Sequence, residues 1–340
     1  MEIKTGIENK AQWDDYVRQN PQGGLFHLSG WLGAVEEVFK YKIIYLSAQE
    51  GARIAGVLQL GLCKNIFSKK ILVSVPFGTC GGVLADSEEA REKLTDKAIE
   101  LAKELGAQYL ELRNREKQKE LQDVQELYVD FKKELPADPK QCLGILPRKA
   151  RAEARHAIGK GLQTQTGIHL LRQCYDLYAI NSKRLGSPFL PYKFFQALAG
   201  HFKEQSTVLS IKINGKAAAS VFIFFYKDTI MPLYSGALWR FTKYGTNNLM
   251  YLRVMELGSS MGFKYFDFGR SRKGSGPYHF KINQGFEPTQ LYYQFYLNKA
   301  KEIPNLNPSN KKLGVFKTLW RHTPSILTNK LGPYLIWFVP

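Results

Sequence analysis

Residues 208–226 read VLSIKINGKAAASVFIFFY, two runs rich in β-branched and aromatic residues on either side of Asn214-Gly215. An Asn-Gly pair between such runs is a strong short-range signal for a β-hairpin, because both residues tolerate the positive φ angles of a tight turn. We therefore expect one strand over 208–213 and its antiparallel partner over 216–226.

The elements after this hairpin follow in a clear order. A third strand is expected over 229–234. An amphipathic helix over 247–261 then carries apolar residues every three to four positions and stops at Gly262. A last strand alternates over 264–268. The order is hairpin, strand, helix, strand.

The first half of the chain has the same order. The pattern places strands at 43–48, 53–60, 71–76 and 109–113, and a helix at 87–105. Gly81 and Gly236 are 155 residues apart, and Gly106 and Gly262 are 156 apart. The repeated order at a constant offset indicates two copies of one unit. We expect an α/β (α+β) fold, with two tandem units that are each a mixed β-sheet flanked by helices.

The remaining segments complete the predicted domain organisation. A basic helical segment over 138–161, interrupted by Pro147, separates the halves. Two amphipathic helices, over 168–185 and 192–202, open the second unit. From N- to C-terminus the expected division is an N-terminal unit at 1–137, a catalytic C-terminal unit at 138–300 and a basic tail at 301–340.

The charge of the chain indicates an anionic partner. Lys and Arg number 48 against 30 Asp and Glu, a net charge of +18, and the excess is concentrated at 148–184 and from Lys299 to the end. Nucleic acid, a membrane surface or a phosphorylated substrate fits such an excess. The alternative is that the basic surface only keeps the protein in solution.

Other features of the composition exclude several classes of protein. The four cysteines form no C-x-x-C pair and the six histidines no H-x-x-x-H pair, so we expect neither a disulfide framework nor a metal site. The N-terminus lacks the apolar core of a signal peptide, and the longest apolar run, 217–226, is far short of the ~20 residues of a spanning helix. We expect a cytoplasmic protein, with 331–340 as a candidate for peripheral contact with the inner membrane.

Short motifs along the chain resemble those of one family. They are LVSVPF (72–77) with Gly81-Gly82, ELR (111–113), RLGSP (184–188), FDFGRS (266–271), GPYHFK (276–281), NLNP (305–308) and WR (320–321). These motifs are similar to those of FemAB-type aminoacyltransferases, which consist of two tandem copies of the GNAT acyltransferase fold. The likeness is greatest to the FemAB-like proteins associated with exosortase (PEP-CTERM) systems.

The resemblance implies a reaction in which a substrate amine attacks an activated acyl group. It implies an N-acyl- or aminoacyl-transferase that acts on an amine of a cell-envelope precursor, such as one for peptidoglycan or exopolysaccharide. The anionic co-substrate would be aminoacyl-tRNA or acyl-CoA, with no tightly bound cofactor and no metal.

The stretch 266–286, FDFGRSRKGSGPYHFKINQGF, is the predicted site of the chemistry. Its glycines let the backbone approach a ligand, and its cations suit a phosphate or a developing oxyanion. The resemblance makes Lys281 the residue that stabilises the oxyanion, delivered with Phe280 by the end of a strand into a cleft between the copies. Asp267 would accept a proton from the amine or hold Arg270, which would bind anionic substrate. His279 is a weaker acid–base candidate.

Three further residues are expected to bind substrate. Arg184 resembles in position the arginine with which the family grips the phosphate of the acceptor, and a guanidinium suits that geometry. Tyr192 and Tyr234 would line the same groove.

Two other functions remain open. An acyl-CoA-dependent N-acetyltransferase usually carries R/Q-x-x-G-x-G/A before the helix that follows its third strand, where backbone N–H groups bind pyrophosphate. The junction here, WRFTKYGTN (239–247), does not fit that motif. A non-enzymatic module that binds nucleic acid or polysaccharide through its basic surface would instead show salt-dependent binding without turnover.

Overall fold

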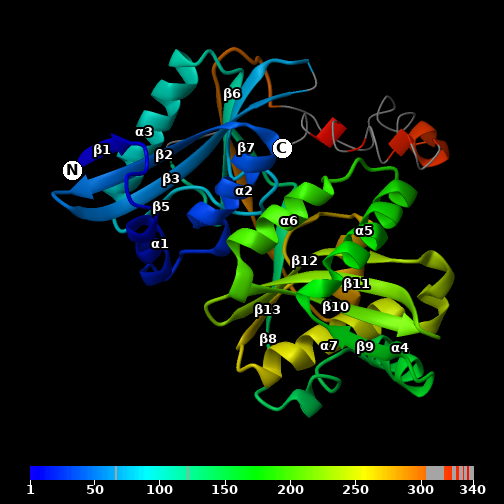
Figure 1. The fold of residues 1–340 in the computed structure, drawn as a ribbon. Coiled ribbons are helices and arrows are strands. Elements are labelled where there is room, and N and C mark those ends of the chain that lie inside the picture. The colour runs from blue at the N-terminus through cyan, green and yellow to red at the C-terminus, as the bar shows by residue number, and fades with distance from the viewer. Residues whose placement is uncertain are drawn as a thin grey trace. The chain divides into compact units, whose positions relative to one another are not determined.

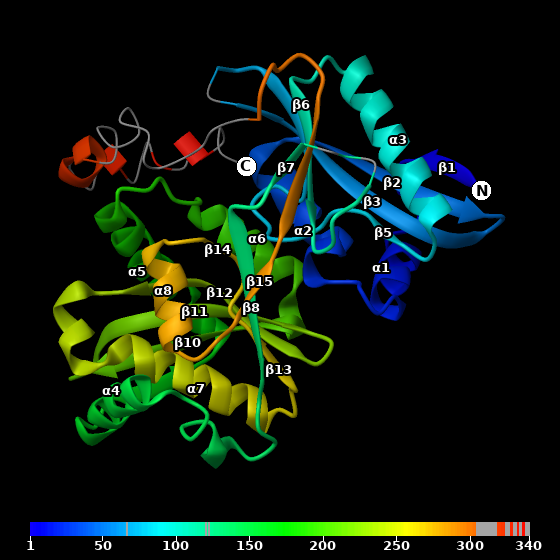
Figure 2. The same cartoon turned by 180° about the vertical axis from the view of Figure 1, so that it is seen from behind.

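A computed structural model describes residues 1–65, 67–119, 121, 123–303, 318–323, 327–328, 332 and 335–336. In these residues the chain forms two sheets of eight strands, with helices packed on them, as Figures 1 and 2 show. The predicted α/β architecture with two mixed sheets is confirmed.

The chain divides into two units. Unit 1 contains Met1–Tyr128 and a second segment that begins at Gln290, and unit 2 contains Val129–Thr289 and most of the described tail. This differs from the predicted boundaries 1–137, 138–300 and 301–340. The reason is that each sheet takes one strand from the other half of the sequence. Local periodicity reveals a strand but not its partner.

Unit 1 is built on a sheet with the order β1-β2-β3-β4-β6-β16-β7, in which β5 pairs with β3. Its strands are β1 (Glu2–Thr5), β2 (Lys42–Glu50), β3 (Arg53–Lys64), β4 (Lys70–Ser74), β5 (Leu84–Ala85), β6 (Tyr109–Asn114), β7 (Asp123–Gln125) and β16 (Tyr292–Leu297). Its helices are α1 (Lys10–Gln19), η1 (Leu25–His27), α2 (Ser29–Phe39) and α3 (Glu88–Glu104). The predicted helix at 87–105 is thus α3, capped by the Ser87 hydroxyl, which accepts from the N–H of Ala90.

Unit 2 has the sheet order β14-β8-β13-β12-β11-β10-β9, with β15 paired to β8. Its strands are β8 (Tyr128–Glu134), β9 (Gln163–Thr166), β10 (Ser206–Ile213), β11 (Lys216–Tyr226), β12 (Thr229–Ala237), β13 (Tyr265–Asp267), β14 (Ser271–Arg272) and β15 (Pro288–Gln290). Its helices are η2 (Pro139–Gln141), α4 (Arg148–Gly159), η3 (Ile168–Leu170), α5 (Leu171–Leu185), α6 (Tyr192–His201), η4 (Lys203–Gln205), η5 (Trp239–Tyr244), α7 (Thr246–Ser260) and α8 (Gly276–Asn283).

The central hairpin of unit 2 has the predicted turn. Asn214 and Gly215 both have positive φ, 49° and 75°, and β10 pairs antiparallel with β11. Glycine adopts that region at no steric cost, and asparagine tolerates it better than other residues with a side chain. The sequence signal and the backbone geometry therefore agree.

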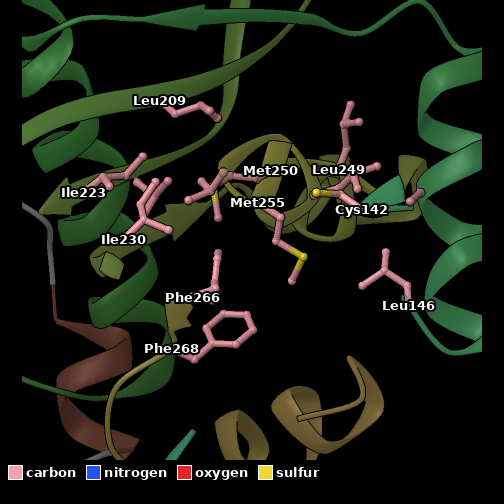
Figure 3. Packing of buried hydrophobic residues seen from close by; sticks show 14 of the residues in the cluster. Cys142, Leu146, Leu209, Ile223, Ile230, Leu249, Met250, Met255, Phe266 and Phe268 are labelled. Carbon is pink, nitrogen blue, oxygen red and sulfur yellow. The ribbon is translucent and has the colours of Figure 1, made fainter. Parts of the chain in front are cut away.

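Both faces of strand β11, at the centre of the unit 2 sheet, are buried. Because side chains alternate across a strand, Val221 and Ile223 of β11 face α7, whereas Phe222 and Phe224 face the other way. Figures 1 and 2 show α5 and α6 on one side of the sheet and α4 and α7 on the other. Figure 3 shows the α7 side, where Met255 and Phe266 lie among the buried side chains. This core fixes β12 and β13, the strands that carry the candidate site.

The described part of the tail contacts unit 2. The Trp320 indole donates to the carbonyl oxygen of Ser187 at 3.1 Å, and Arg321 donates to that of Leu185. The family motif at 305–308 lies outside the described residues, as does most of 331–340. No helix within the described ranges has both the length and the apolar character needed to cross a membrane.

Candidate functional site in unit 2

The two parallel strands of unit 2 separate soon after they meet. β12 pairs with β13 at only two positions, the second being Ile230 with Phe266. β12 then continues to Ala237, whereas β13 ends at Asp267. Residues 231–237 of β12 therefore do not pair with β13. In a parallel α/β sheet, the carboxyl ends of separating strands are the usual position of a ligand.

β12 is also irregular at this point. Pro232 pairs with Ile223 and Tyr234 with Phe222, which leaves Leu233 as the extra residue of a β-bulge. The extra residue of a bulge lies outside the regular hydrogen-bond ladder, and bulges are over-represented beside active sites. The bulge thus lies on the part of β12 that has no pairing with β13.

The segment that carries Phe280 and Lys281 is a helix rather than the end of a strand. Ser275 caps α8 by accepting from the N–H of Tyr278, and Pro277 occupies its first turn. The expectation that a strand delivers these two residues is therefore wrong. The glycines around the helix obscured its signal, although Ser-Gly-Pro is an acceptable helix start.

Lys281 holds the turn that follows β13. Its side chain is only 7% exposed, and its Nζ donates to the carbonyl oxygens of Phe268 (2.8 Å), Gly269 (2.7 Å) and Arg270 (3.1 Å). The same ammonium lies 5.2 Å from the centroid of the Phe131 ring. A lysine ammonium has three N–H donors, and all three are used here. The described contacts therefore make Lys281 a clamp on the backbone of this turn.

Burial lowers the pKa of Lys281 to about 8, because the charged form loses its hydration. The carboxylates of Asp130 and Asp267 oppose this shift and raise the pKa, whereas Arg270 lowers it. Asp267 is 3% exposed, and its Oδ1 accepts from the N–H of Gly269 at 2.7 Å. Asp267 and Lys281 thus bond to the same turn, the first to an N–H and the second to carbonyl oxygens.

A tyrosine of α7 lies beside the part of β12 that does not pair with β13. The Tyr251 hydroxyl is 2.9 Å from the Ser235 hydroxyl, and its ring lies 4.6 Å from Phe268 and 5.6 Å from Phe280. Burial raises the pKa of Tyr251, although its hydrogen bond to Ser235 partly opposes this. Tyr251 therefore keeps its proton at neutral pH and can donate it.

Four of the predicted residues lie close to Phe268. Phe280 contacts Phe268, with ring centroids 6.3 Å apart, and Lys281, Asp267 and Arg270 belong to the turn or bind it. Burial raises the pKa of Tyr234 well above its usual value, and the charge of Arg270 partly opposes this shift. Tyr234 therefore interacts electrostatically with this group.

The remaining two predicted residues lie on α5 and α6. The Tyr192 ring contacts the Tyr175 ring at a tilt of 52°, with centroids 5.1 Å apart, and the Arg172 guanidinium lies 5.0 Å from its centroid. An aromatic series runs from there through Tyr178 to Tyr234. Arg184 is exposed at the end of α5, and it donates to the Asn181 side chain. Neither residue has a described contact with Lys281 or Arg270.

The sequence interpretation missed Tyr251, Ser235 and Asp130. Tyr251 fits the helical period of α7 as a core residue, and Ser235 and Asp130 lie in strands where polar residues are common. No local pattern marks any of them. Their importance follows only from the fold, which places Tyr251 against β12 and Asp130 near the ammonium of Lys281.

The start of α7 differs from a typical pyrophosphate site. Gly245 precedes the helix with φ +71°, and a Cβ there would lie 2.5 Å from the carbonyl oxygen of Glu153. α4 therefore packs directly against the start of α7. In the described ranges, moreover, no group of three His, Cys, Asp or Glu side chains could hold a metal ion.

At the corresponding point in unit 1, the loop after β4 bonds to β6. There the parallel strands β4 and β6 also pair at two positions, but the loop after β4 returns to β6. The N–H groups of Gly81 and Gly82 donate to the carbonyl oxygen of Arg113, whose buried guanidinium donates to the carbonyl oxygens of Val75 and Gly78. The two copies thus share a topology. In unit 1 the loop after the third strand, β4, bonds back to β6, whereas the described residues of unit 2 have no such loop between β12 and β13.

Comparison with known proteins agrees with this fold. Residues 147–281 match the model of the acetyltransferase (GNAT) domain. No curated protein sequence matches the chain. The crystal structure of FemX is similar with a TM-score of 0.67 at 14% identity, covering 87% of this chain and 98% of that one.

Two other solved structures are similar along most of their length. A tandem GNAT protein from the clavulanic acid biosynthesis pathway has a TM-score of 0.54 at 13% identity, covering 86% of this chain and 97% of its own. The C-terminal domain of a protein described as a lysylphosphatidylglycerol synthetase from Agrobacterium fabrum has a TM-score of 0.51 at 13% identity, covering 84% and 91%. The chain therefore has a tandem GNAT-like fold, and unit 2 contains the part that matches the GNAT acetyltransferase domain.

Proposed function

We propose that the chain is an N-acyltransferase whose reaction takes place in unit 2, beside β12 where it separates from β13. One observation supports this most: the bulge at Leu233, the Tyr251–Ser235 pair and the clamped turn at Phe268–Arg270 belong to the same region of the sheet. In this proposal the amine nitrogen attacks the acyl carbonyl carbon. The C–N bond forms, the bond to the leaving group breaks, and the amine gives its proton to water, from which Tyr251 is protonated again after it has protonated the leaving group.

Each residue then has a chemical role. The N–H of Leu233 would donate to the developing oxyanion, because a bulge releases its extra residue from the ladder. Tyr251 would give its proton to the leaving group, since its raised pKa keeps the hydroxyl protonated at neutral pH. Arg270 would bind anionic substrate, and Lys281 and Asp267 would fix the turn that carries it.

The proposal also concerns the identity of the acyl donor and of the amine acceptor. The domain match at 147–281 favours acyl-CoA as donor, whereas the packing of α4 on the start of α7 favours a donor held in another way, such as aminoacyl-tRNA. We propose an amine of a cell-envelope or exopolysaccharide precursor as acceptor. Arg184 on α5, with Tyr192, Tyr234 and Phe280, would bind it, since a guanidinium suits a phosphate.

The test is an acyl-transfer assay that follows new amide bonds by mass spectrometry. Purified protein receives either acetyl-CoA or charged tRNA together with amino-sugar acceptors. General acid catalysis contributes about 10²–10⁴ in rate, so we expect Tyr251→Phe to lower kcat by at least about 100-fold. Tyr265→Phe on β13 is the matched control, because it removes a hydroxyl from the same unit but away from Ser235.

Two results would contradict the proposal. Transfer at wild-type rate by Tyr251→Phe would exclude the proton donor. Salt-dependent binding of RNA or polysaccharide, with no amide formed from any donor, would instead support a binding module.

A further inference from the structure

Unit 1 contains a cavity of about 120 Å³ at the carboxyl ends of its parallel strands. Cys80, Gly82 and Leu84 follow β4 in the chain and form one wall, and Arg115, Lys117 and Gln118 follow β6 and form the other. The carboxyl ends of parallel strands are the usual position of ligands in α/β sheets. The catalytic role proposed for unit 2 makes no use of this cavity, so the inference is independent of it.

The wall formed by the loop after β4 is fixed in a strained conformation. Val75 and Phe77 have φ of +50° and +63°, a region that residues with a side chain rarely adopt. The Arg113 guanidinium holds the loop by donating to the carbonyl oxygens of Val75 and Gly78. A Cβ on Gly82 would overlap the Asn114 side chain. Strain of this kind persists only where the surroundings enforce it, and it is concentrated at ligand sites.

The other wall presents a buried acceptor. Gln118 is only 7% exposed, and its Nε2 donates to Asn114 Oδ1 at 3.3 Å. Its backbone N–H donates to Gln294 Oε1 at 2.8 Å, which fixes the residue in place. The Gln118 Oε1 atom accepts no hydrogen bond from the described protein atoms. A buried acceptor in this state costs free energy unless a ligand or water donates to it.

The charge and size of the cavity restrict the ligand. Arg91, Arg115 and Lys117 line it in addition to the structural Arg113, and Glu116 is the only carboxylate among the described lining residues. Since a water occupies about 30 Å³ of liquid, the cavity has room for about four waters or one small polyatomic anion. Gln118 lines this cavity, so its acceptor without a described partner favours a ligand that donates at least one hydrogen bond.

We propose that this cavity binds a phosphoryl group that carries a hydroxyl, either as free phosphate or as the terminal phosphate of a larger compound. The cations would neutralise its charge, and its O–H would donate to Gln118 Oε1. Sulfate has nearly the same shape and at pH 6 carries more negative charge than phosphate, but it has no proton, so it cannot make the last bond.

The test is isothermal titration of the full chain with inorganic phosphate, sulfate and glycerol 3-phosphate at pH 6. One hydrogen bond corresponds to about a fivefold change in affinity, so we expect the ratio of phosphate to sulfate affinity to be about fivefold higher in the wild type than in Gln118→Met. Gln118→Met keeps the size of the side chain but removes the acceptor, and the difference in charge between the two anions is the same for both proteins. Binding of glycerol 3-phosphate with the affinity of phosphate would identify a terminal phosphate as ligand, and its failure to bind would identify free phosphate.

Charge variants provide the second arm. Arg115→Gln with Lys117→Gln changes two exposed residues, so folding is preserved, and it should weaken both anions about tenfold. Lys119→Gln is the matched control, since Lys119 belongs to the same loop but does not line the cavity. A cavity filled by water alone would show no saturable binding of any of the three anions. That result, or an unchanged preference for phosphate in Gln118→Met, would overturn the proposal.

Discussion

Lys281 is the residue on which the candidate site depends most. Its ammonium is buried, and three backbone carbonyl oxygens replace the water that it would otherwise bind. Such a group has two effects that oppose each other. The charged form organises the Phe268–Arg270 turn, but burying the charge costs free energy.

The contribution of Lys281 to stability should rise with pH between about 8 and 10.5. The folded state releases the proton of Lys281 near pH 8, whereas the unfolded chain keeps it up to the usual 10.5. For this group the unfolded state therefore binds more protons in this window, and its contribution to the free energy of unfolding increases by at most about 3 kcal/mol. Buried thiols such as Cys63 act in the opposite direction, because burial raises their pKa. Urea denaturation of the wild type and of Lys281→Met at pH 7.5 and 9.5 separates the two effects. The slope of stability against pH should be lower in Lys281→Met, and an equal slope in that variant would assign the effect to another group.

Activity should change in the opposite direction over the same range. A neutral amine has two N–H donors, so one of the three carbonyl oxygens loses its bond when Lys281 is deprotonated. We expect kcat to fall above about pH 8 as the turn loosens, with burial first, and then Asp130, Asp267 and Arg270, setting the midpoint. A pH–rate profile checks this, with Lys281→Arg as the variant whose charge does not titrate. A fall in kcat with the same midpoint in Lys281→Arg would contradict the assignment to Lys281.

The sequence could point to Lys281 but not to its environment. Its motif resembles that of an acyltransferase family, and the same resemblance makes Phe280, Arg270 and Asp267 candidate site residues. Its contacts, however, are backbone oxygens at 268–270, which no sequence pattern encodes. The role that the resemblance implied, direct stabilisation of the oxyanion, stays a prediction.

At the scale of the elements, α5 and β12 are in close contact at Gly236 of β12. A Cβ on Gly236 would lie 2.3 Å from the backbone carbonyl of Leu177. Gly236→Ala must therefore push α5 away from the strand that carries the bulge. We expect a loss of about 3 kcal/mol in stability, measured by urea denaturation, together with reduced activity.

A glycine in open space provides the control for this prediction. Gly200 in α6 has no atom within 4 Å of a Cβ position, so Gly200→Ala should leave stability equal or raise it by about 0.5–1 kcal/mol. Comparable destabilisation by the two substitutions would show that backbone entropy, rather than the close approach, dominates at Gly236.

Elements with strong local signals were predicted well. The hairpin at Asn214-Gly215 and α3 after Ser87 have a turn or a cap that fixes them locally. The sequence pattern does not predict α1 and α2, and it predicts an extended segment where α8 lies. In α8 the apolar period is too short to recognise, so Ser275 and Pro277 were the only signals. Local chemistry thus predicted the sheet hairpins better than the short helices.

At the scale of the whole molecule, the two sheets exchange strands. β16 pairs with β6 over six positions in unit 1, and β8 pairs with β13 in unit 2. Each sheet is thus completed by a segment from the other half of the chain. The sequence predicted the duplication because its offsets are local and regular, but not the exchange, since strand pairing depends on distant partners.

The exchange predicts that a fragment cut at the apparent boundary will not fold. Residues 1–137 lack β16, so the edge of β6 beside the buried Glu111 and Arg113 would be open. We expect this fragment to aggregate or to lack a cooperative thermal transition by circular dichroism. Joining residue 128 to 290 through a short glycine linker should restore folding, because the N–H of Leu291 donates to the carbonyl oxygen of Tyr128. A cooperative melt of 1–137 alone would contradict this expectation.

The late position of β16 also affects how the protein is made. Unit 1 leaves the ribosome almost complete, yet its sheet must wait for a strand that is synthesised nearly 180 residues after β6. At about 5–20 residues per second, this delay is on the order of tens of seconds. During that time the nascent chain presents an unpaired strand edge, which makes it a natural client for chaperones that bind growing polypeptides.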